Sequence, residues 1–472
     1  MGISERPSDE SESVSRRKFL RKAAAIGAGA GIGLTATESI LRVQRVNAVT
    51  TDQLVKVDTS DTTSDFLNPK VSAGAGITKT VLSPGGYEQL RIAVSSNVLV
   101  SPMRQLVWRD STTTYVRDGI TGMVTTYTSS TRDSDALQAA LNSLTPGRTW
   151  KEKVVVVGGP FGLSVIIFVS SYTILDITGA SLQAVAGNQG QGIITIPRPN
   201  TSDVEIWGGL IDGNRPPPTS TAPGRHGVFL DSGTSRIKVI GTKFINIFRG
   251  YGVYLAGNTS DVLLQDLSFD HTDGAAIASD TSVPGDNVNV RIIRPIITNF
   301  SDRARSGLFN GAFNAIHTEN NEPNTSSFNR RWLIEGADID GSGSVEDSHG
   351  IYIGQMADAR IVGCRTFKPR LNGLAIYSSI YVKAFGNHFE SSGQAGVAGY
   401  QNGVQVDDTG VTPASDYCSC CRNTLANNIG YAAVERGSAH HNAFCDNLLV
   451  GNGAGISATG TMTLVVDNVG TA

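Results

Sequence analysis

The strongest constraint on the fold is a short motif, glycine–aliphatic–any residue–aliphatic, that returns at irregular intervals from residue 227 onward. Its copies are Gly227–Leu230, Gly252–Leu255, Gly274–Ile277, Gly350–Ile353, Gly373–Ile376 and Gly403–Val406, with a looser copy at Ala315–Thr318. Apolar residues alternate within each copy, which is the period of a β-strand. A unit repeated about every 20 to 40 residues cannot bury its apolar side alone, so the copies must stack. The motif therefore predicts an all-β solenoid, a parallel β-helix.

A second run of alternating apolar residues follows most copies of the motif, as at Ile237–Phe244, Val262–Phe269 and Trp332–Ile339. Aligning these runs gives one column that we interpret as an inward stack: Ile211, Phe244, Phe269, Ile297, Ile339, Phe367, Phe389, Leu425 and Leu449. Two positions later, Asn246, Asn299 and Asn427 share another column. Asparagine tolerates left-handed backbone, so this column predicts a repeated tight turn.

A helix is expected over Asp133–Asn142, ahead of the first strands. Asp133 is an acidic residue suited to an N-cap, and apolar pairs at Ala136/Leu137 and Ala140/Leu141 lie one turn apart. The stretch 154–157 and the stretches 164–168 and 172–175 that follow it are apolar and read as strands.

An acid-capped helix before such strands resembles the start of the pectate-lyase-like superfamily, the right-handed parallel β-helix proteins. The resemblance covers roughly residues 131–472. It implies that the helix closes the open end of the solenoid. The superfamily includes polysaccharide lyases, glycoside hydrolases, esterases, epimerases, phage tailspikes and adhesins, so the resemblance implies a fold rather than an activity.

The N-terminal residues 15–22, Ser-Arg-Arg-Lys-Phe-Leu-Arg-Lys, precede an apolar stretch at 23–36. The stretch is too short to span a bilayer, and the arginine pair resembles a twin-arginine export signal. Val46-Asn-Ala48 fits a cleavage site, so a signal peptide is expected over residues 1–48. This implies a prokaryotic protein that is secreted or held at the cell surface. The alternative is a basic patch before a helix without a targeting role.

Residues 49–130 form the next expected region. Asp61-Thr-Thr63, Phe66-Leu67 and Gly85-Gly86 resemble a small repeat of phage tail-fibre proteins, although Ser64-Asp65 and Tyr87 depart from its pattern. The resemblance implies a short β module that attaches or oligomerises the chain, with a homotrimer as the expected state. The alternative is a linker rich in threonine, serine and glycine. The β-helix itself is expected over residues 131–472.

Charge and cysteine content restrict the partners. The chain has 39 basic and 42 acidic residues, so no basic excess indicates a nucleic-acid partner, and no further segment reads as a membrane span. Cys421 and Cys445 align on adjacent repeats, 24 residues apart. A stack of structural cysteines is the preferred interpretation. A disulfide, and a metal site at Cys418-Ser-Cys-Cys421, are the alternatives.

Two columns beside the motif are expected to face outward, where β-helix enzymes hold their active groove. The residues before the glycine are His226, Tyr251, Asp273, Asn314, His349, Asn372 and Asn402. The residues between the two aliphatics are Phe229, Tyr254, Ala276, His317, Tyr352, Ala375 and Gln405. With adjacent strands about 4.8 Å apart, Asp273, His317 and His349 are expected in one patch with Tyr254 and Tyr352. Aromatic rings beside carboxylates and imidazoles suit a sugar-binding groove.

A further column contains Asp212 and Asp270, two repeats and so roughly 9.6 Å apart, near the upper separation of the carboxylates of an inverting hydrolase. Asp270, His271 and Asp273 form the densest ionisable cluster of the solenoid. His271–Gly274 is similar to a polygalacturonase motif, but the other motifs of that family occur in the wrong order or are missing. The sequence predicts no definite cofactor. A lyase would use Ca²⁺ and an arginine base, such as Arg330 beside the insertion between Phe300 and Arg331.

These patterns predict an exported β-helix protein that acts on a polysaccharide. The reaction would be hydrolysis or β-elimination, with Asp270 or Asp273 as acid or base and His317 or His349 assisting. Each residue also has a structural interpretation, because aspartate and asparagine cap turns and outward tyrosines pack against neighbours. The alternative function is a non-catalytic adhesin or a tailspike-like fibre that binds glycan.

Overall fold

A computed structural model describes residues 77–82, 89–94, 103–128, 132–185, 191–216, 224–279, 285–302, 313–320, 328–408 and 414–471. The chain divides into two compact units, Met1–Ala93 and Val94–Ala472. In the first region, β1 (Ile77–Leu82) and β2 (Gln89–Val94) pair in a two-stranded sheet. The expected signal peptide and most of the tail-fibre-like residues lie outside the described residues.

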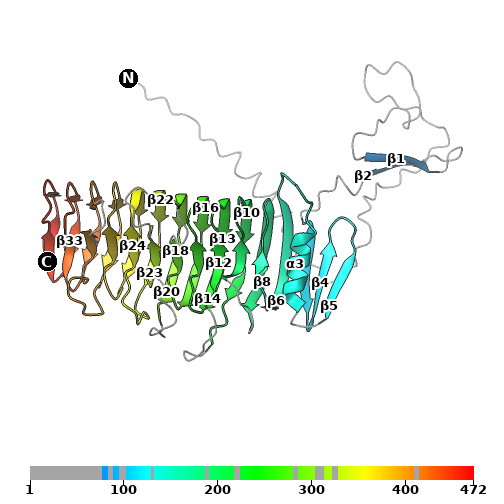
Figure 1. The fold of residues 1–472 in the computed structure, drawn as a ribbon, viewed down its shortest axis with the longest axis horizontal. Helices are drawn as coiled ribbons and strands as arrows, with labels where there is room; N and C mark the ends of the chain where they lie inside the picture. Colours follow the sequence, from blue (N-terminus) through cyan, green and yellow to red (C-terminus); the bar gives the residue numbers. More distant parts are fainter. Residues whose placement is uncertain are drawn as a thin grey trace, which may run out of the picture. The chain divides into compact units, whose positions relative to one another are not determined.

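The second unit is a right-handed parallel β-helix, in which successive coils run from helix α3 to the C-terminal strands (Figure 1). One sheet carries the glycine motif and is named here the motif face. Its strands are β7 (Ile167–Phe168), β9 (Gly192–Ile196), β12 (His226–Leu230), β15 (Val253–Leu255), β18 (Ile277–Ser279), β21 (Ile316–Thr318), β24 (Ile351–Gly354), β27 (Leu374–Tyr377), β30 (Val404–Asp407), β33 (Tyr431–Glu435) and β36 (Ala454–Ser457).

Two further faces complete each coil, and both are built from parallel pairs. The second face contains β8 (Thr173–Ala184), β10 (Ser202–Trp207), β13 (Ser235–Ile240), β16 (Ser260–Gln265), β19 (Val288–Ile293), β22 (Asn329–Glu335), β25 (Met356–Val362), β28 (Lys383–Phe385), β31 (Ser419–Cys421), β34 (Ala443–Cys445) and β37 (Leu464–Val466). The third face contains β11 (Leu210–Asp212), β14 (Lys243–Ile247), β17 (Ser268–Thr272), β20 (Ile296–Phe300), β23 (Asp338–Asp340), β26 (Arg365–Phe367), β29 (His388–Glu390), β32 (Thr424–Ala426), β35 (Leu448–Val450) and β38 (Val469–Thr471).

The predicted inward stack is confirmed, with one correction. Phe244 pairs with Phe269 in register, their rings stack at 4.9 Å, and both are buried. The exception is Phe367, because Ile339 pairs with Thr366 and the ring of Phe367 turns outward. Each inward residue follows a turn position by three residues, and Gly363 sets that position in this coil with φ +61°. The turn therefore decides the register of this strand. Thr366 takes the inward position, although the ring of Phe367, the next residue, would bury more apolar area there.

The asparagine column is also confirmed as a left-handed turn. Asn246, Asn299 and Asn427 have φ values of 54°, 47° and 54°. His271 lies in the same column, since it follows Asp270 as Asn246 follows Ile245, and its φ is 59°. The backbone of His271 therefore has a structural role that asparagine fills in neighbouring coils.

Buried asparagines satisfy the backbone at a second turn. The backbone N–H of Asn387 donates to Oδ1 of Asn423 at 3.0 Å, and that of Asn423 donates to Oδ1 of Asn447 at 2.9 Å. Asn447 continues the ladder to Asn468 at 3.0 Å. Because a buried N–H without a partner is costly, each amide stabilises the coil beside it.

Helix α3 (Asp133–Asn142) packs its apolar pairs against the first strands, β3 (Gln105–Asp110), β4 (Thr113–Asp118), β5 (Val124–Thr128) and β6 (Glu152–Leu163). Ala136, Leu137, Ala140 and Leu141 are buried as expected. The expectation of an acidic N-cap is wrong, because Arg132 is the N-cap and Asp133 is the first helical residue.

The carboxylate of Asp133 turns into the core instead of capping the helix. Its Oδ2 lies 2.8 Å from Nη1 of Arg109 and accepts the N–H of Gly162 at 2.7 Å, while Oδ1 accepts the hydroxyl of Thr114 at 2.5 Å. The buried charge is thereby paired and fully hydrogen-bonded, as the interior requires. Asp133 fastens the helix to the first coil.

The third motif copy is out of register with the prediction. Val253 pairs with Ile277 and Tyr254 with Ala278, so Ala276, not Gly274, takes the glycine position. A side chain at Gly227 would meet the ring of Phe244 at 2.5 Å, and Gly252 faces Phe269 in the same way. In the next coil the inward residue is Ile297, which leaves room for a methyl group.

Cys421 and Cys445 are register partners, as predicted, and they form a disulfide. The preferred expectation of unbonded stacked cysteines is therefore wrong for this pair. Cys418 and Cys420 are buried. Burial raises the pKa of the Cys418 thiol to about 12 and raises that of Cys420 as well. Cys421 is bonded to Cys445, so the alternative metal site at Cys418-Ser-Cys-Cys421 lacks one of its thiols.

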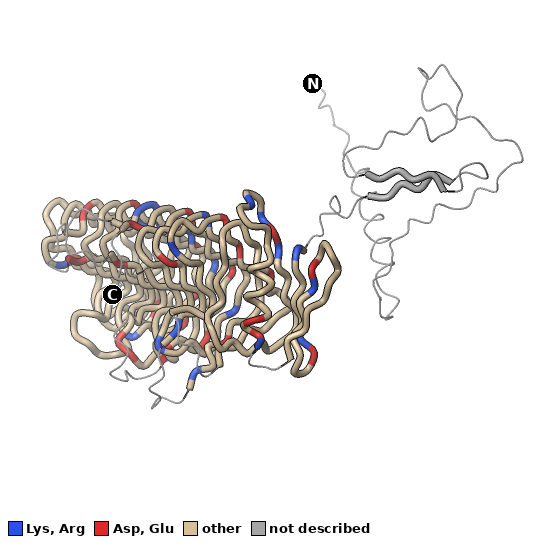
Figure 2. Tube along the Cα trace, turned by 45° about the vertical axis from the view of Figure 1, so that its right-hand side comes forward, with Lys and Arg blue, Asp and Glu red and all other residues tan. Residues whose placement is uncertain are grey.

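Charged residues of both signs are interspersed over the solenoid (Figure 2). Pairs on neighbouring coils, such as Arg236 with Asp203 at 2.7 Å and Arg294 with Asp266 at 2.8 Å, account for part of this pattern. Within the described ranges, no helix has the length and apolar character needed to cross a bilayer.

Candidate functional site

The outer side of β21, β24, β27 and β30 carries a cluster that we name the polar patch. The strands pair in register, so its side chains fall into three columns. The first column of the patch is Asn314, His349, Asn372 and Asn402. The second column is His317, Tyr352, Ala375 and Gln405, and the third is Glu319, Gly354, Tyr377 and Asp407. The alternating residues of the same strands, such as Ile316 and Ile351, point into the core and are buried.

The first column is a ladder of backbone hydrogen bonds. Oδ1 of Asn314 accepts the N–H of His349 at 2.8 Å, and Nδ1 of His349 accepts the N–H of Asn372 at 3.2 Å. Asn372 continues the ladder by accepting the N–H of Asn402 at 2.9 Å. His349 thus does at its coil what asparagine does at the others.

This position fixes the protonation of His349. Burial lowers the pKa of His349 to about 3, so its ring is neutral at neutral pH. Since Nδ1 accepts a hydrogen bond, the single proton lies on Nε2. The ring lies 5.7 Å from that of Tyr352 and 6.3 Å from that of Tyr377, measured between centroids. His349 is a fixed neutral donor among tyrosines.

His317, Tyr352 and Glu319 form the chemical centre of the patch. Oδ1 of Asn314 is occupied, so its Nδ2 donates to Nδ1 of His317 at 2.8 Å. The proton of His317 therefore lies on Nε2, which is 3.2 Å from Oε2 of Glu319. The imidazole stacks on the ring of Tyr352 at 4.8 Å.

Tyr352 also directs its hydroxyl to Glu319. Burial raises the pKa of this phenol, and the charge and hydrogen bond of Glu319 raise it further. The hydroxyl therefore stays protonated at neutral pH and donates to the carboxylate. One partly exposed carboxylate thus faces both an imidazole N–H and a phenol O–H.

The far edge of the patch holds a second carboxylate. Nε2 of the buried Gln405 donates to Oδ2 of Asp407 at 2.7 Å and to the hydroxyl of Tyr377 at 3.1 Å. Burial raises the pKa of Asp407, and the positive charge of Arg436 offsets part of that rise. Arg436 is thus close enough to act electrostatically at this edge.

The smallest side chains of the patch, Gly354 and Ala375, lie between its functional groups. A Cβ at Gly354 would sit 2.9 Å from Cε1 of Tyr352 and 3.4 Å from Cγ of Glu319. Glycine here lets the ring and the carboxylate approach each other.

The same outer face is apolar in the preceding coils. Phe229, Tyr251, Tyr254 and alanines 256, 275 and 278 form a separate buried cluster, named here the aromatic patch. His226 stacks on Tyr254 at 4.7 Å, and its Nδ1 accepts the N–H of Tyr251 at 3.0 Å. Burial lowers the pKa of His226 to about 3. Tyr254 shares a column with His317 and Tyr352, as expected, but Ala278 separates it from the polar patch.

Asp273 does not join the polar patch, which corrects the predicted grouping. It lies two residues before Ala275, which takes the expected column position next to Ala276. Nη1 of Arg215 is 3.2 Å from Oδ1 of Asp273, and the N–H of Arg249 donates to Oδ2 at 3.0 Å. Arg215 also pairs with Asp302. This buried arginine–carboxylate cluster neutralises Asp273 and holds the turn.

Asp270 and His271 lie beside that cluster. Nδ1 of the partly exposed His271 is 2.6 Å from Oδ2 of Asp302 and its Nε2 is 3.7 Å from Oδ1 of Asp270. Asp270 also accepts the amide of Asn299 at 2.8 Å. The sequence correctly grouped these two residues, but it placed them with Asp273 as catalytic groups, whereas all three contact the turn scaffold.

Asp212 lies two coils from Asp270, as predicted, because both pair with Ile245. Its carboxylate accepts amides from Gln183 at 2.9 Å and Asn246 at 3.1 Å. Arg330 lies on β22 of the second face, with Nε 3.4 Å from Oδ2 of Asp286. Neither residue is on the motif face.

Sequence analysis missed Glu319, Tyr377 and Asp407. Each lies two residues after a member of the column that contains His317, Ala375 and Gln405, so strand alternation would have placed them outward. Their column lies one outward position beyond the two columns that were expected to face outward.

Comparisons with known proteins identify the fold. No protein-family model and no curated protein sequence matches the chain. The A-module of a mannuronan C-5 epimerase from Azotobacter vinelandii superposes with a TM-score of 0.53 at 15% identity, over 72% of this chain and 95% of that one. The tailspike protein gp208 of Dettilon gives a TM-score of 0.49 at 15% identity, over 69% of this chain and 64% of its own. An alginate lyase from Paenibacillus gives 0.45 at 14%, over 70% and 97%.

Proposed function

We propose that this chain is an exported enzyme that removes a carbon-bound proton from an acidic polysaccharide, as in β-elimination or epimerisation of a uronate. The observation that carries the proposal is the Glu319 carboxylate, which faces the N–H of His317 at 3.2 Å and the hydroxyl of Tyr352. General acid–base chemistry needs a proton acceptor and a proton donor that can both reach the reacting atoms of one substrate, and neighbouring groups meet that need.

The roles follow from the protonation states. Glu319 takes the proton from C-5 of the uronate, and His317 positions its carboxylate. In β-elimination, the C-4 to oxygen bond breaks, C-4 and C-5 form a double bond, and Tyr352 gives its proton to the departing oxygen. In epimerisation, C-5 instead receives a proton on its opposite side. Arg436, the cation beside the far edge of the patch, lies more than three coils from Glu319 and would bind the carboxylate of another uronate unit of the same polymer.

Hydrolysis by paired carboxylates is less well supported on the polar patch. Glu319 and Asp407 are three coils apart, which is roughly 14 Å along the strand stack. Glycosidases place their two carboxyl groups about 5 to 9.5 Å apart. The separation favours a mechanism with one carboxylate and a phenol.

Two further observations support the setting. The Cys421–Cys445 disulfide suits an oxidising compartment, as the twin-arginine-like N-terminus predicts. The structural neighbours include proteins named for an action on mannuronan and alginate. The substrate class proposed here depends on the patch, because the likeness to those proteins is one of fold.

A panel of polyuronates and neutral polysaccharides tests the proposal. We expect unsaturated chain ends or inverted uronate residues from at least one polyuronate, and no product from the neutral polymers. Reducing ends without unsaturation, released from a neutral glycan, would contradict it and would favour hydrolysis.

The second candidate is a non-catalytic glycan-binding protein of the tailspike or adhesin kind. It is favoured by His317, whose two ring nitrogens are both engaged, by Asn314 and Glu319. Retention of the chain on an immobilised polyuronate, without product at any enzyme concentration, would select this candidate.

A further inference from the structure

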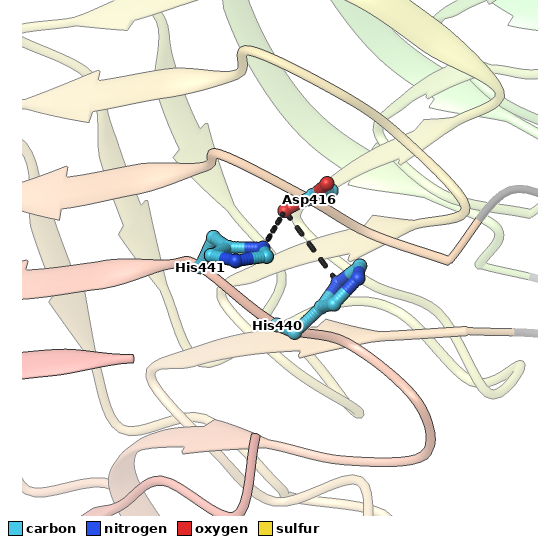
Figure 3. Close-up of side chains that lie close together, drawn as sticks. All are labelled: Asp416, His440 and His441. Carbon is cyan, nitrogen blue, oxygen red and sulfur yellow. Dashed lines mark hydrogen bonds and ion pairs between the residues drawn. The ribbon is translucent and has the colours of Figure 1, made fainter. Parts of the chain in front are cut away.

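Asp416, His440 and His441 converge at one turn near the C-terminal end of the solenoid (Figure 3). Asp416 precedes β31 and the two histidines precede β34 in the next coil. Asp416 and His440 are bridge partners, so the register of the fold brings the three together.

The ligand atoms have the spacing of a coordination shell. Oδ1 of Asp416 is 3.1 Å from Nδ1 of His441 and 3.5 Å from Nδ1 of His440. One atom of each residue lies within 4.8 Å of the others. A tetrahedral ion with bonds of about 2.1 Å separates its ligands by about 3.4 Å. The two measured distances lie on either side of that value.

One nitrogen of this group lacks another function. Nδ1 of His440 is buried and, in the described part of the chain, has no hydrogen-bond partner. It is nevertheless directed to the carboxylate, as Figure 3 shows. A buried polar atom without a partner costs about 1 to 3 kcal/mol, and coordination of a cation would remove that cost.

The surroundings hold the ligands in place. The ring of Tyr417 stacks on His441 at 5.0 Å, and the backbone N–H of Tyr417 donates to Oδ1 of Asp416 at 2.9 Å. The nearby Glu435 is fully engaged, since it accepts from Asn442 at 2.7 Å and Gly460 at 2.9 Å. In metal sites, contacts such as those of Tyr417 with Asp416 and His441 hold the ligands in the orientation that binds the ion.

We propose that Asp416, His440 and His441 bind one divalent transition-metal ion of the zinc class. Two imidazoles and one carboxylate suit Zn²⁺ and its neighbours, whereas Ca²⁺ and Mg²⁺ take oxygen ligands. Water completes the coordination, because three protein ligands leave a position open.

The ion would clamp two consecutive coils. The Cys421–Cys445 disulfide joins the same two coils a few residues further on. A metal clamp and a disulfide would together hold these two coils in register through their side chains, in addition to the parallel pairing of β31 and β34.

Zinc binding by the full chain tests the proposal without any assay of activity. The protein, free of an affinity tag and stripped with EDTA, is titrated with ZnCl₂ in a calorimeter. We expect one ion per chain, and more than tenfold weaker binding for Asp416→Asn and for His440→Gln. His388→Gln is the matched control, because His388 also pairs with an acid, Glu390, at 3.3 Å on another face. It should bind zinc as the parent does.

A second measurement does not depend on how the variants fold. Hydrogen exchange of the parent chain, with and without zinc, should slow selectively at the amides around 416–421 and 440–445. Absence of zinc binding would overturn the proposal. So would equal binding by parent and Asp416→Asn, or protection spread evenly over the solenoid.

Discussion

The aromatic patch and the polar patch occupy the same outer face, the same columns and the same strand register, yet their chemistry differs. His226 in the aromatic patch and His349 in the polar patch each accept the N–H of the next coil through Nδ1. Burial lowers the pKa of both to about 3. Around His226 the remaining positions are rings and alanines, whereas around His349 they include carboxylates and amides.

The difference teaches how to separate structure from function in a solenoid. The backbone ladder alone can explain a histidine at this position. His226 makes the same contact as His349, although no carboxylate belongs to the aromatic patch beside it. What the ladder does not explain is Glu319, Tyr352 and Asp407, whose side chains accept no backbone N–H from a neighbouring coil in the parts of the chain that the structure describes. Those residues are the better candidates for chemistry.

The largest expected effect comes from Glu319→Gln. The amide cannot accept the C-5 proton, so we expect a loss of about 10²- to 10⁴-fold in kcat/KM on the polyuronate substrate. Glu390→Gln is the control, because His388 and Glu390 repeat the His-x-Glu spacing off the patch. Equal activity of the two variants would remove Glu319 from the mechanism.

The aromatic patch should respond in stability rather than in chemistry. Phe229 is 4% exposed and stacks on Tyr254 at 5.4 Å. Phe229→Ala should lower the free energy of unfolding by about 3 kcal/mol, as judged by urea denaturation. At temperatures where the variant is folded, kcat/KM should stay within about twofold of the parent. A large loss of activity in the folded variant would mean that both patches contact the reacting sugar.

The pH dependence of stability should distinguish ladder from catalysis at His349. Its folded pKa of about 3 lies below the ordinary value of 6.5, so protons favour the unfolded chain. The contribution of the neutral ring is complete above about pH 6.5 and is lost as pH falls toward 3, by about 1.4 kcal/mol per pH unit.

Asparagine fills this column in neighbouring coils and does not titrate. His349→Asn should therefore keep an acceptor for the N–H of the next coil. Between pH 7 and pH 5, its free energy of unfolding should fall by about 2 kcal/mol less than that of the parent. His388→Asn, the same substitution at a partly exposed histidine on another face, is the matched control. If His349→Asn unfolds with the parent's pH dependence, the ring is not held neutral.

The smallest expected effect is that of Gly354→Ala. The new methyl would press on the ring of Tyr352, 2.9 Å away, and turning the ring costs about 1 kcal/mol. That cost corresponds to about a fivefold loss in kcat/KM if Tyr352 carries the proton. Gly455→Ala on the same face, where a Cβ meets no atom within 4 Å, is the control. A loss shared by both variants would show that the effect is general to the sheet.

The fold was largely predictable because its signals repeat. The glycine motif, the inward stack and the asparagine turn recur in coil after coil, and errors arose where one signal was replaced. Ala276 stands for glycine where Ile297 replaces phenylalanine, and Thr366 takes an inward position that Phe367 was expected to fill. In both coils, local packing or turn geometry outweighed the pattern.

The site was less predictable, since an active site need not repeat. His317, His349 and Tyr352 were placed together correctly, but a two-residue shift in one coil moved Asp273 to the Arg215 cluster. The Asp416–His440 spacing equals the 24 residues between the disulfide cysteines, and that step was visible in the sequence.

Exchange of carbon-bound hydrogen tests the central claim most directly, because both β-elimination and epimerisation begin by removing the C-5 proton. The parent protein, Glu319→Gln and Glu390→Gln are each incubated with a polyuronate in D₂O, and deuterium in the polymer and its products is measured by NMR. We predict deuterium at C-5, or loss of that hydrogen in unsaturated products, with the parent and Glu390→Gln but not with Glu319→Gln. Exchange that is undiminished in Glu319→Gln would contradict the assignment of the polar patch as the site of proton transfer.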